Sequence, residues 1–206
     1  MQRLRPLIVG FLALAIAACS QANGQDILED VTDGASSSSG SSASSVAMIG
    51  ERVLSGGILE IGNANAAVTM ELFVNHDSPY SRRFHAFMPL LQKEFVEKGK
   101  MKIDIIPVPF AKYPNSANHV TRLLCAAAQG KGLAMHSLLM NGTLTLVPAG
   151  TDMAAFNACM ARPSSPSSFA ASRGVTLVPT YVINGQTFTG LPTEADLVGS
   201  IKHASQ

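Results

Sequence analysis

The sequence has few cysteines, few charged residues and an N-terminal apolar run that is short. Its 206 residues include three cysteines, and an odd number cannot all pair within one chain, so at least one has another role. Charged residues make up 14% of the chain and the formal net charge is +1, which excludes a nucleic-acid or acidic-lipid binder driven by overall charge. Hydrophobic residues reach 47%, enough for a folded core, which excludes a globally disordered chain.

The N-terminal apolar run, residues 7–18, has about 12 residues, whereas a membrane-spanning helix needs about 20. It follows Arg3 and Arg5 and ends in Ile16-Ala17-Ala18-Cys19, a pattern typical of an export signal. This ending resembles the lipobox of bacterial lipoproteins. The resemblance implies that residues 1–18 are a signal peptide, that Cys19 carries a lipid, and that the protein lies on the periplasmic side of the envelope, with the outer membrane slightly favoured. The alternative is an ordinary secretion signal with an incidental cysteine.

Residues 19–57 form a predicted tether. The stretch 34–45 contains only serine, glycine and alanine, and such a composition buries no apolar surface and behaves as a flexible coil. A lipidated N-terminus followed by a flexible linker is consistent with a domain held away from a membrane.

The folded domain is predicted to begin at Ile58 and to continue to residue 206. A mostly apolar run at 68–74 predicts a buried strand, and Asp77-Ser78-Pro79 then predicts a helix start. Asn184-Gly185 is typical of a two-residue hairpin turn, and Thr193 of a helix N-cap. The predicted elements are a strand at 68–74, a helix at 77–98, a strand at 101–107, three helices within 115–159, strands at 180–183 and 187–189, and a helix at 193–203.

This order, β-α-β, a helical insert at about 115–173, then β-β-α, resembles the thioredoxin fold in its DsbA-like form. Three separated segments carry the resemblance to DsbA/DsbG-like proteins: residues 61–85, 123–142, and 174–190, which reads GVTLVPTYVINGQTFTG. The resemblance implies an α/β domain, membership of a thiol–disulfide oxidoreductase family, and a cis proline at Pro179.

The motif that carries the family's chemistry is altered. Where the family has Cys-Pro-Tyr-Cys, this chain has Ser78, Pro79, Tyr80 and Ser81. Redox exchange needs a thiolate stabilised at a helix N-terminus and a second thiol that resolves the mixed disulfide. Serine forms no exchangeable bond to sulfur, so we expect no dithiol–disulfide exchange and assign no catalytic residue.

Our main hypothesis is therefore a polypeptide-binding or chaperone-like module of the cell envelope, without a cofactor or a nucleic-acid partner. By resemblance, the binding residues are Ser78, Tyr80, Val178, Pro179 and Thr180. Its partner is a polypeptide substrate or an envelope protein, and the Cys19 lipid supplies the membrane contact.

Two alternatives involve Ser78 as a chemical group. Ser-Pro-Tyr-Ser also resembles the start motif of kappa-class glutathione transferases, which implies glutathione as cofactor, with Ser78 near its sulfur and Val178-Pro179 against its backbone. A nucleophilic Ser78 with His76 as base is the other alternative, but the sequence has no G-x-S-x-G motif, and a helix cap explains Ser78 more simply.

The remaining cysteines, Cys125 and Cys159, lie 34 residues apart on predicted helices of the insert. The family resemblance and an export compartment imply a structural disulfide between them, and two buried free thiols are the alternative. The five histidines form no paired metal-ligand motif, so we predict no metal site.

Overall fold

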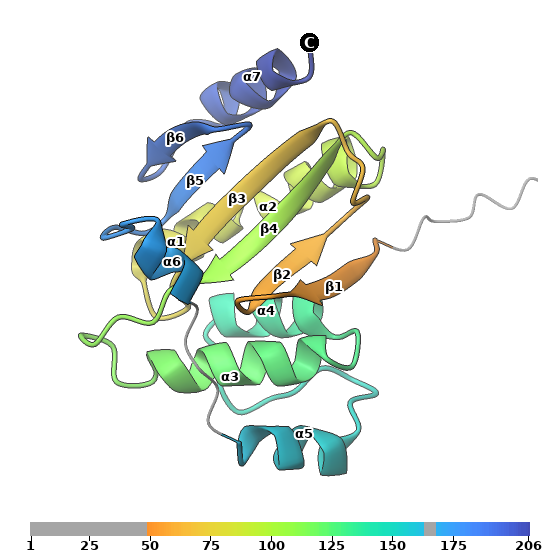
Figure 1. Cartoon of the computed structure of the whole chain (residues 1–206), viewed down its shortest axis with the longest axis vertical. Helices are drawn as coiled ribbons and strands as arrows, with labels where there is room; N and C mark the ends of the chain where they lie inside the picture. Colours follow the sequence, from red (N-terminus) through yellow and green to blue (C-terminus); the bar gives the residue numbers. More distant parts are fainter. Residues whose placement is uncertain (1–48, 163–167) are drawn as a thin grey trace, which may run out of the picture. The chain divides into compact units, whose positions relative to one another are not determined.

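The computed structural model describes residues 49–162 and 168–206, so the predicted signal peptide, Cys19 and most of the predicted tether lie outside the described residues. A six-stranded mixed sheet with the strand order β1-β2-β4-β3-β5-β6 forms the centre of the domain (Figure 1). Only β3 and β4 are parallel, and the other neighbours are antiparallel. The strands are β1 (Glu51–Leu54), β2 (Ile58–Ile61), β3 (Val68–Val74), β4 (Met101–Pro107), β5 (Thr180–Ile183) and β6 (Gln186–Thr189).

The first described strand lies earlier in the chain than the predicted start of the domain at Ile58. Strand β1 lies within the segment 19–57 that the sequence assigned to a tether, and it pairs along its whole length with β2. β1 is mostly exposed and has no clear alternating apolar pattern, so its sequence alone does not identify it. Its position is set by pairing with the buried β2 and by Glu51, whose carboxylate accepts hydrogen bonds from the backbone amides of Gly132 and Leu133.

The predicted helix at 77–98 is divided into three pieces: α1 (Pro79–His85), α2 (Met88–Leu91) and the π-helical turn η1 (Gln92–Val96). Pro89 explains the first break, because it has no amide hydrogen to donate to the carbonyl of His85 one turn earlier. Phe84, Met88 and Leu91 of this segment are nevertheless all buried in the larger apolar cluster, which also contains residues of the sheet.

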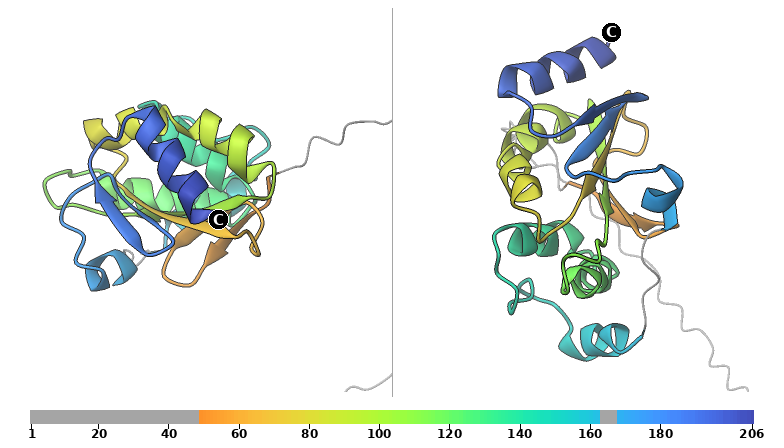
Figure 2. Two further views of the ribbon diagram at one scale, coloured as in Figure 1. Left: turned by 90° about the horizontal axis from the view of Figure 1, so that it is seen from above. Right: turned by 90° about the vertical axis from the view of Figure 1, so that its left-hand side faces the viewer.

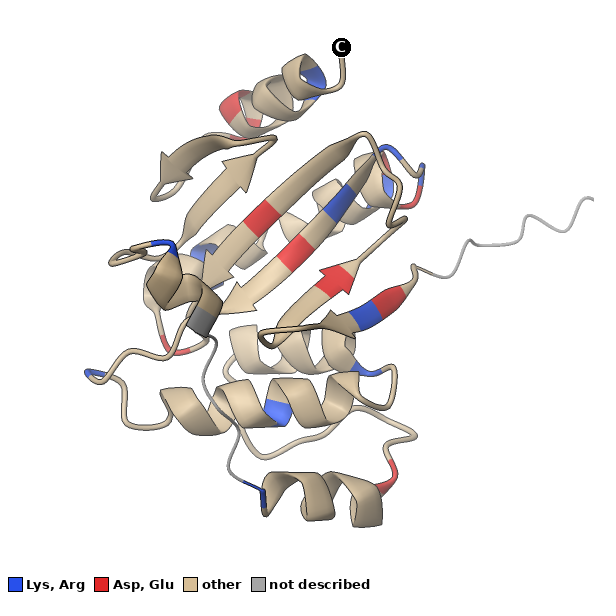
Figure 3. Ribbon diagram, viewed as in Figure 1, with Lys and Arg blue, Asp and Glu red and all other residues tan. Residues whose placement is uncertain are grey.

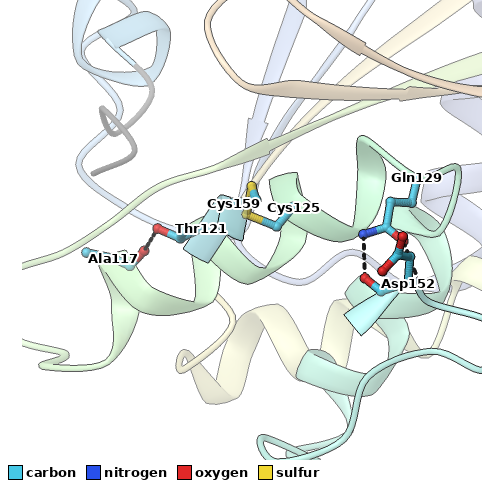
Figure 4. Close-up of a disulfide and its surroundings, with 6 residues drawn as sticks. All are labelled: Ala117, Thr121, Cys125, Gln129, Asp152 and Cys159. Atoms are coloured by element: carbon cyan, nitrogen blue, oxygen red, sulfur yellow. Dashed lines mark hydrogen bonds between the residues drawn. A yellow bond between two sulfur atoms is a disulfide. The ribbon is translucent and has the colours of Figure 1, made fainter. Parts of the chain in front are cut away.

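The insert contains the three predicted helices, α3 (Ser116–Ala127), α4 (Gly132–Met140) and α5 (Met153–Met160), and a short α6 (Ser168–Ser172). Cys125 and Cys159 form a disulfide that joins α3 to α5, with Cα atoms 5.7 Å apart (Figure 4). Gln129 braces the same two helices, because its side chain donates to the carbonyl of Asp152 and accepts from the Asp152 amide (Figure 4).

The C-terminal unit follows the prediction closely. Asn184 and Gly185 both have positive φ, as a hairpin turn of this kind requires. α7 (Glu194–Ala204) is capped by Thr193, whose hydroxyl accepts a hydrogen bond from the Asp196 amide at 3.2 Å.

Apolar side chains pack on both faces of the sheet. The larger cluster joins the sheet to α1–α4 and α7, and a smaller one, around Phe73, Ile106 and Ala170, lies under α6. Figure 2 shows α6 on the opposite side of the sheet from α2. No helix among the described residues has the length and apolar character needed to cross a membrane.

Candidate functional site

The predicted site residues of the first motif lie where β3 ends and α1 begins. Asn75 fixes this turn: its side-chain amide donates to the Val108 carbonyl and to Ser116 Oγ, each at 2.7 Å, and its oxygen accepts from the Asp77 amide at 2.9 Å. Asn75 is buried, so it secures the end of β3 to the segment after β4 and to the start of α3.

Ser78 and Ser81 are structural residues in this arrangement. Ser78 is the N-cap of α1 and its Oγ accepts from the Ser81 amide at 3.5 Å. Ser81 is fully buried and its Oγ accepts a hydrogen bond from the backbone amide of Asn75 at 3.2 Å. Both hydroxyls therefore serve the local backbone, and what the motif presents to solvent is Pro79 and the ring of Tyr80, which is 56% exposed.

The second predicted segment lies at the same edge of the sheet. β5 pairs with β3 so that Thr180 stands opposite Phe73, which brings Pro179 to the end of β3 where the turn to α1 starts. The Val178–Pro179 peptide bond is cis, and the Thr180 hydroxyl donates to the Leu177 carbonyl at 2.8 Å. The structure thus brings two segments about 100 residues apart in sequence to one place, as the family resemblance implies.

The segment before the cis proline is partly exposed. Gly190 donates to the Pro179 carbonyl at 2.8 Å, but within residues 49–162 and 168–206 no group forms a backbone hydrogen bond with Val178. Leu177 is 63% exposed and Val178 is half-buried. An unpaired amide and carbonyl beside exposed apolar side chains can receive an extended chain.

His76 does not act on Ser78 through its Nε2. This nitrogen lies 3.1 Å from Nδ1 of His136, while the His76 carbonyl accepts from Arg82 Nε at 2.9 Å. The contact between His76 and His136 joins residues 60 positions apart, and no sequence motif marked it. His119 Nδ1 lies 3.2 Å from Asp77 Oδ2, and burial lowers the pKa of His119 even though the Asp77 carboxylate raises it.

The site has no metal-binding arrangement in the part of the chain that the structure describes, where no group of three or more histidine, cysteine, aspartate or glutamate side chains is placed to hold an ion. A groove of about 330 Å³ lies elsewhere, between η1 and α7, with Phe95 and Val198 among its lining residues.

A parallel β3–β4 pair, an antiparallel β5–β6 hairpin, a helix start at the end of β3 and a cis proline facing it define a thioredoxin fold with a helical insert. A family model described as thioredoxin matches residues 55–203, and the chain belongs to this family. A comparison with curated proteins finds no match.

Solved structures share the fold. The catalytic domain of Proteus mirabilis ScsC superimposes with a TM-score of 0.56 at 19% identity, covering 73% of this chain and 90% of that one. A periplasmic thioredoxin-like protein from Salmonella enterica serovar Typhimurium gives 0.53 at 18% identity, covering 73% and 91%. Wolbachia pipientis alpha-DsbA1 gives 0.59 at 15% identity, covering 71% and 89%. The DsbA-like fold predicted from the sequence is confirmed.

Proposed function

We propose that this chain is an exported thioredoxin-family protein that binds extended polypeptide at the surface formed by Tyr80, Leu177 and Val178, beside the buried Pro179 and Thr180, and that does not exchange disulfides. The observation that carries the proposal is the backbone of Val178, which forms no hydrogen bond with the backbone of any described residue, beside exposed apolar side chains. A peptide strand laid along it would gain main-chain hydrogen bonds, while Tyr80 and Leu177 would contact its side chains.

The geometry of the serine pair supports redox inactivity. The motif offers hydroxyls at both positions, and the buried Ser81 hydroxyl is already an acceptor for the Asn75 amide. Neither position holds sulfur, so no mixed disulfide can form with a substrate. The only described cysteines, Cys125 and Cys159, are bonded to each other in the insert.

The envelope location is proposed from the N-terminal sequence, with Cys19 as the lipid-bearing residue and a periplasmic protein among the structural neighbours. A polypeptide substrate or an envelope protein is the partner that this surface fits. A glutathione-dependent role for Ser78 has less support, because Ser78 is 3% exposed and its Oγ already accepts from the Ser81 amide.

The redox half of the proposal is tested with insulin reduction and with oxidation of a dithiol peptide. The wild-type protein should show no turnover above background. The double variant Ser78→Cys/Ser81→Cys restores a thiol pair at the start of α1 and should gain measurable turnover in the same assays. Clear turnover by the wild-type protein would contradict the proposal.

The binding half is tested by fluorescence anisotropy with a labelled, cysteine-free unfolded polypeptide. Tyr80→Ala should weaken binding by about 5- to 30-fold, as the loss of an aromatic contact at an interface does. Met153→Ala, at an exposed apolar residue of α5, is the matched control and should bind as the wild type does. Equal affinity of the two variants would refute this surface. Calorimetric binding of glutathione that Ser78→Ala weakens would favour the transferase alternative instead.

A further inference from the structure

Three buried or half-buried imidazoles meet beneath the candidate site, each from a different element. His76 follows β3, His85 lies in α1 and His136 lies in α4 of the insert. The His136 ring stands between the other two, with ring centroids 5.2 Å from His76 and 5.1 Å from His85. These three residues, here called the histidine cluster, join the helical insert to the β3–α1 turn.

The histidine cluster is arranged for neutral rings. The 3.1 Å contact between His76 Nε2 and His136 Nδ1 needs one ring to donate and the other to accept. His136 Nε2 and His85 Nδ1 are buried without a hydrogen-bond partner among the described residues. A proton added to any of the three rings would therefore meet no acceptor that compensates its charge.

The charged groups around the cluster also oppose a proton. Arg82 of α1 donates to the His76 carbonyl, and His119 of α3 is close enough to His76 for its charge to oppose a proton there. The nearby carboxylate, Asp77, lies against His119, and no described carboxylate forms an ion pair with a ring of the cluster. A positive charge on His76 would be opposed by Arg82 and would form no ion pair with a described carboxylate, because the Asp77 carboxylate lies against His119.

The titration behaviour follows from this environment. Burial, aided by His119, His85 and Arg82, lowers the pKa of His76 to about 3. Burial lowers the pKa of His136 well below its usual value, with His76 and His85 adding to the effect, and burial also lowers the pKa of His85. At neutral pH all three rings are neutral in the folded protein.

We propose that the histidine cluster is an acid-sensitive latch: its neutral rings hold α4 against the β3–α1 turn, and protonation frees α4 and opens the surface beside Ser78. The consequence for peptide binding rests on the proposed function, whereas the latch itself does not. The three histidines have lower pKa values in the folded protein than in the unfolded chain, where histidine titrates near pH 6.5. The contribution of the neutral histidine cluster to folding stability is therefore complete above about pH 6.5 and is lost as the pH falls.

The first test is urea denaturation followed by circular dichroism between about pH 7.5 and 5, where most carboxylates stay ionised. Below about pH 6, each histidine held neutral should reduce the folding equilibrium constant about tenfold per pH unit. His136→Gln keeps a polar partner for His76 and removes one titrating ring, so the loss of the folding equilibrium constant per pH unit should be about tenfold smaller than in the wild type. His203→Gln, at an exposed residue of α7, should keep the wild-type slope. A His136→Gln slope equal to that of the wild type would overturn the proposal.

The second test separates local opening from global unfolding. Amide hydrogen exchange in α4 is compared with exchange in α7, after correction for the intrinsic pH dependence. On acidification, protection in α4 should fall more steeply than protection in α7, and His85→Gln, a variant at the half-buried ring, should reduce that difference. An equal fall in both helices would refute the latch. Neither measurement uses a peptide, so failure of the latch and failure of the proposed function remain distinguishable.

Discussion

At the scale of single residues, the contacts of a side chain in the fold can differ from those that its position in the sequence suggests. His76 precedes Ser78 by two positions, yet its Nε2 contacts His136. Asp104 shows the same dependence on tertiary context. It lies in β4, paired with Glu60 of β2 on one side and with Glu71 of β3 on the other. Three acidic residues therefore form one row across three neighbouring strands (Figure 3).

The two glutamates of this row form ion pairs, whereas no described ion pair involves Asp104. Glu60 pairs with Arg52 and Lys102, and Glu71 pairs with Arg173. Asp104 is 9% exposed and its Oδ1 is buried without a described partner. Burial raises the pKa of Asp104, and Glu60 and Glu71 raise it further against the opposing effect of Lys102. The folded state therefore holds a proton on Asp104 more tightly than the unfolded chain does, so the stability falls as the pH rises through the range between these two pKa values.

Asp104→Asn should consequently stabilise the protein at neutral pH. The substitution removes a like charge from the row, and opposed like charges across strands cost roughly 0.5–1 kcal/mol. Urea denaturation at pH 7 should show a higher free energy of unfolding than for the wild type, and the difference should shrink as the pH falls towards about 3, below the pKa of Asp104 in both states. A destabilised variant at pH 7 would contradict this account.

At the scale of elements, the insert is held to the sheet by close helix contacts and by covalent linkage. Gly132 begins α4 under β2, and a Cβ at this position would lie 2.7 Å from Ala127 Cβ and 2.8 Å from Leu59 Cδ1, both in buried residues. Gly199 lies within α7, where a Cβ would meet nothing within 4 Å. The two helical glycines therefore differ in the space around them.

Gly132→Ala should destabilise the protein by about 1–3 kcal/mol, because the packed surroundings must move to admit a methyl group. Gly199→Ala, its matched control, should stabilise by about 0.5–1 kcal/mol, since alanine favours the helix and no contact opposes it. Thermal and urea denaturation measure both effects. If both variants changed the free energy of unfolding in the same direction, the close packing around Gly132 would not explain the effect of Gly132→Ala.

The disulfide between α3 and α5 should contribute stability at the same scale. Cys125→Ala/Cys159→Ala opens a loop with a sequence separation of 34 residues and should lower the free energy of unfolding by about 2–4 kcal/mol. Reductant should lower the melting temperature of the wild-type protein and leave that of the double variant unchanged. Thiol counting on the denatured wild-type protein should find Cys125 and Cys159 unreactive before reduction.

At the scale of the whole molecule, we propose separate roles for the N-terminal sequence and the folded domain. The domain described here carries the candidate binding surface, and the sequence around Cys19 predicts how it is held at a membrane. A lipid on Cys19 would retain the domain at the envelope without a spanning helix.

Cys19→Ala should therefore abolish incorporation of labelled fatty acid and move the protein from the membrane fraction to the soluble fraction of cells that express the full chain. Cys125→Ala, which leaves the lipobox-like segment intact, is the control and should remain in the membrane fraction. Retention of Cys19→Ala in the membrane would remove the lipid anchor from the proposal.

The sequence by itself determined the β-α-β and β-β-α units, the three helices of the insert, the caps at Ser78 and Thr193, and the hairpin turn at Asn184-Gly185, because these depend on local periodicity, backbone geometry and neighbouring side chains. It also predicted, through its family resemblance, the cis bond at Pro179 and the disulfide. The tertiary structure alone decided that β1 joins the sheet, that Asp104 lies between two glutamates, and that His76, His85 and His136 meet. Each of these depends on contacts between elements distant in sequence, and the energies of burial and hydrogen bonding that select them leave no local pattern in the chain.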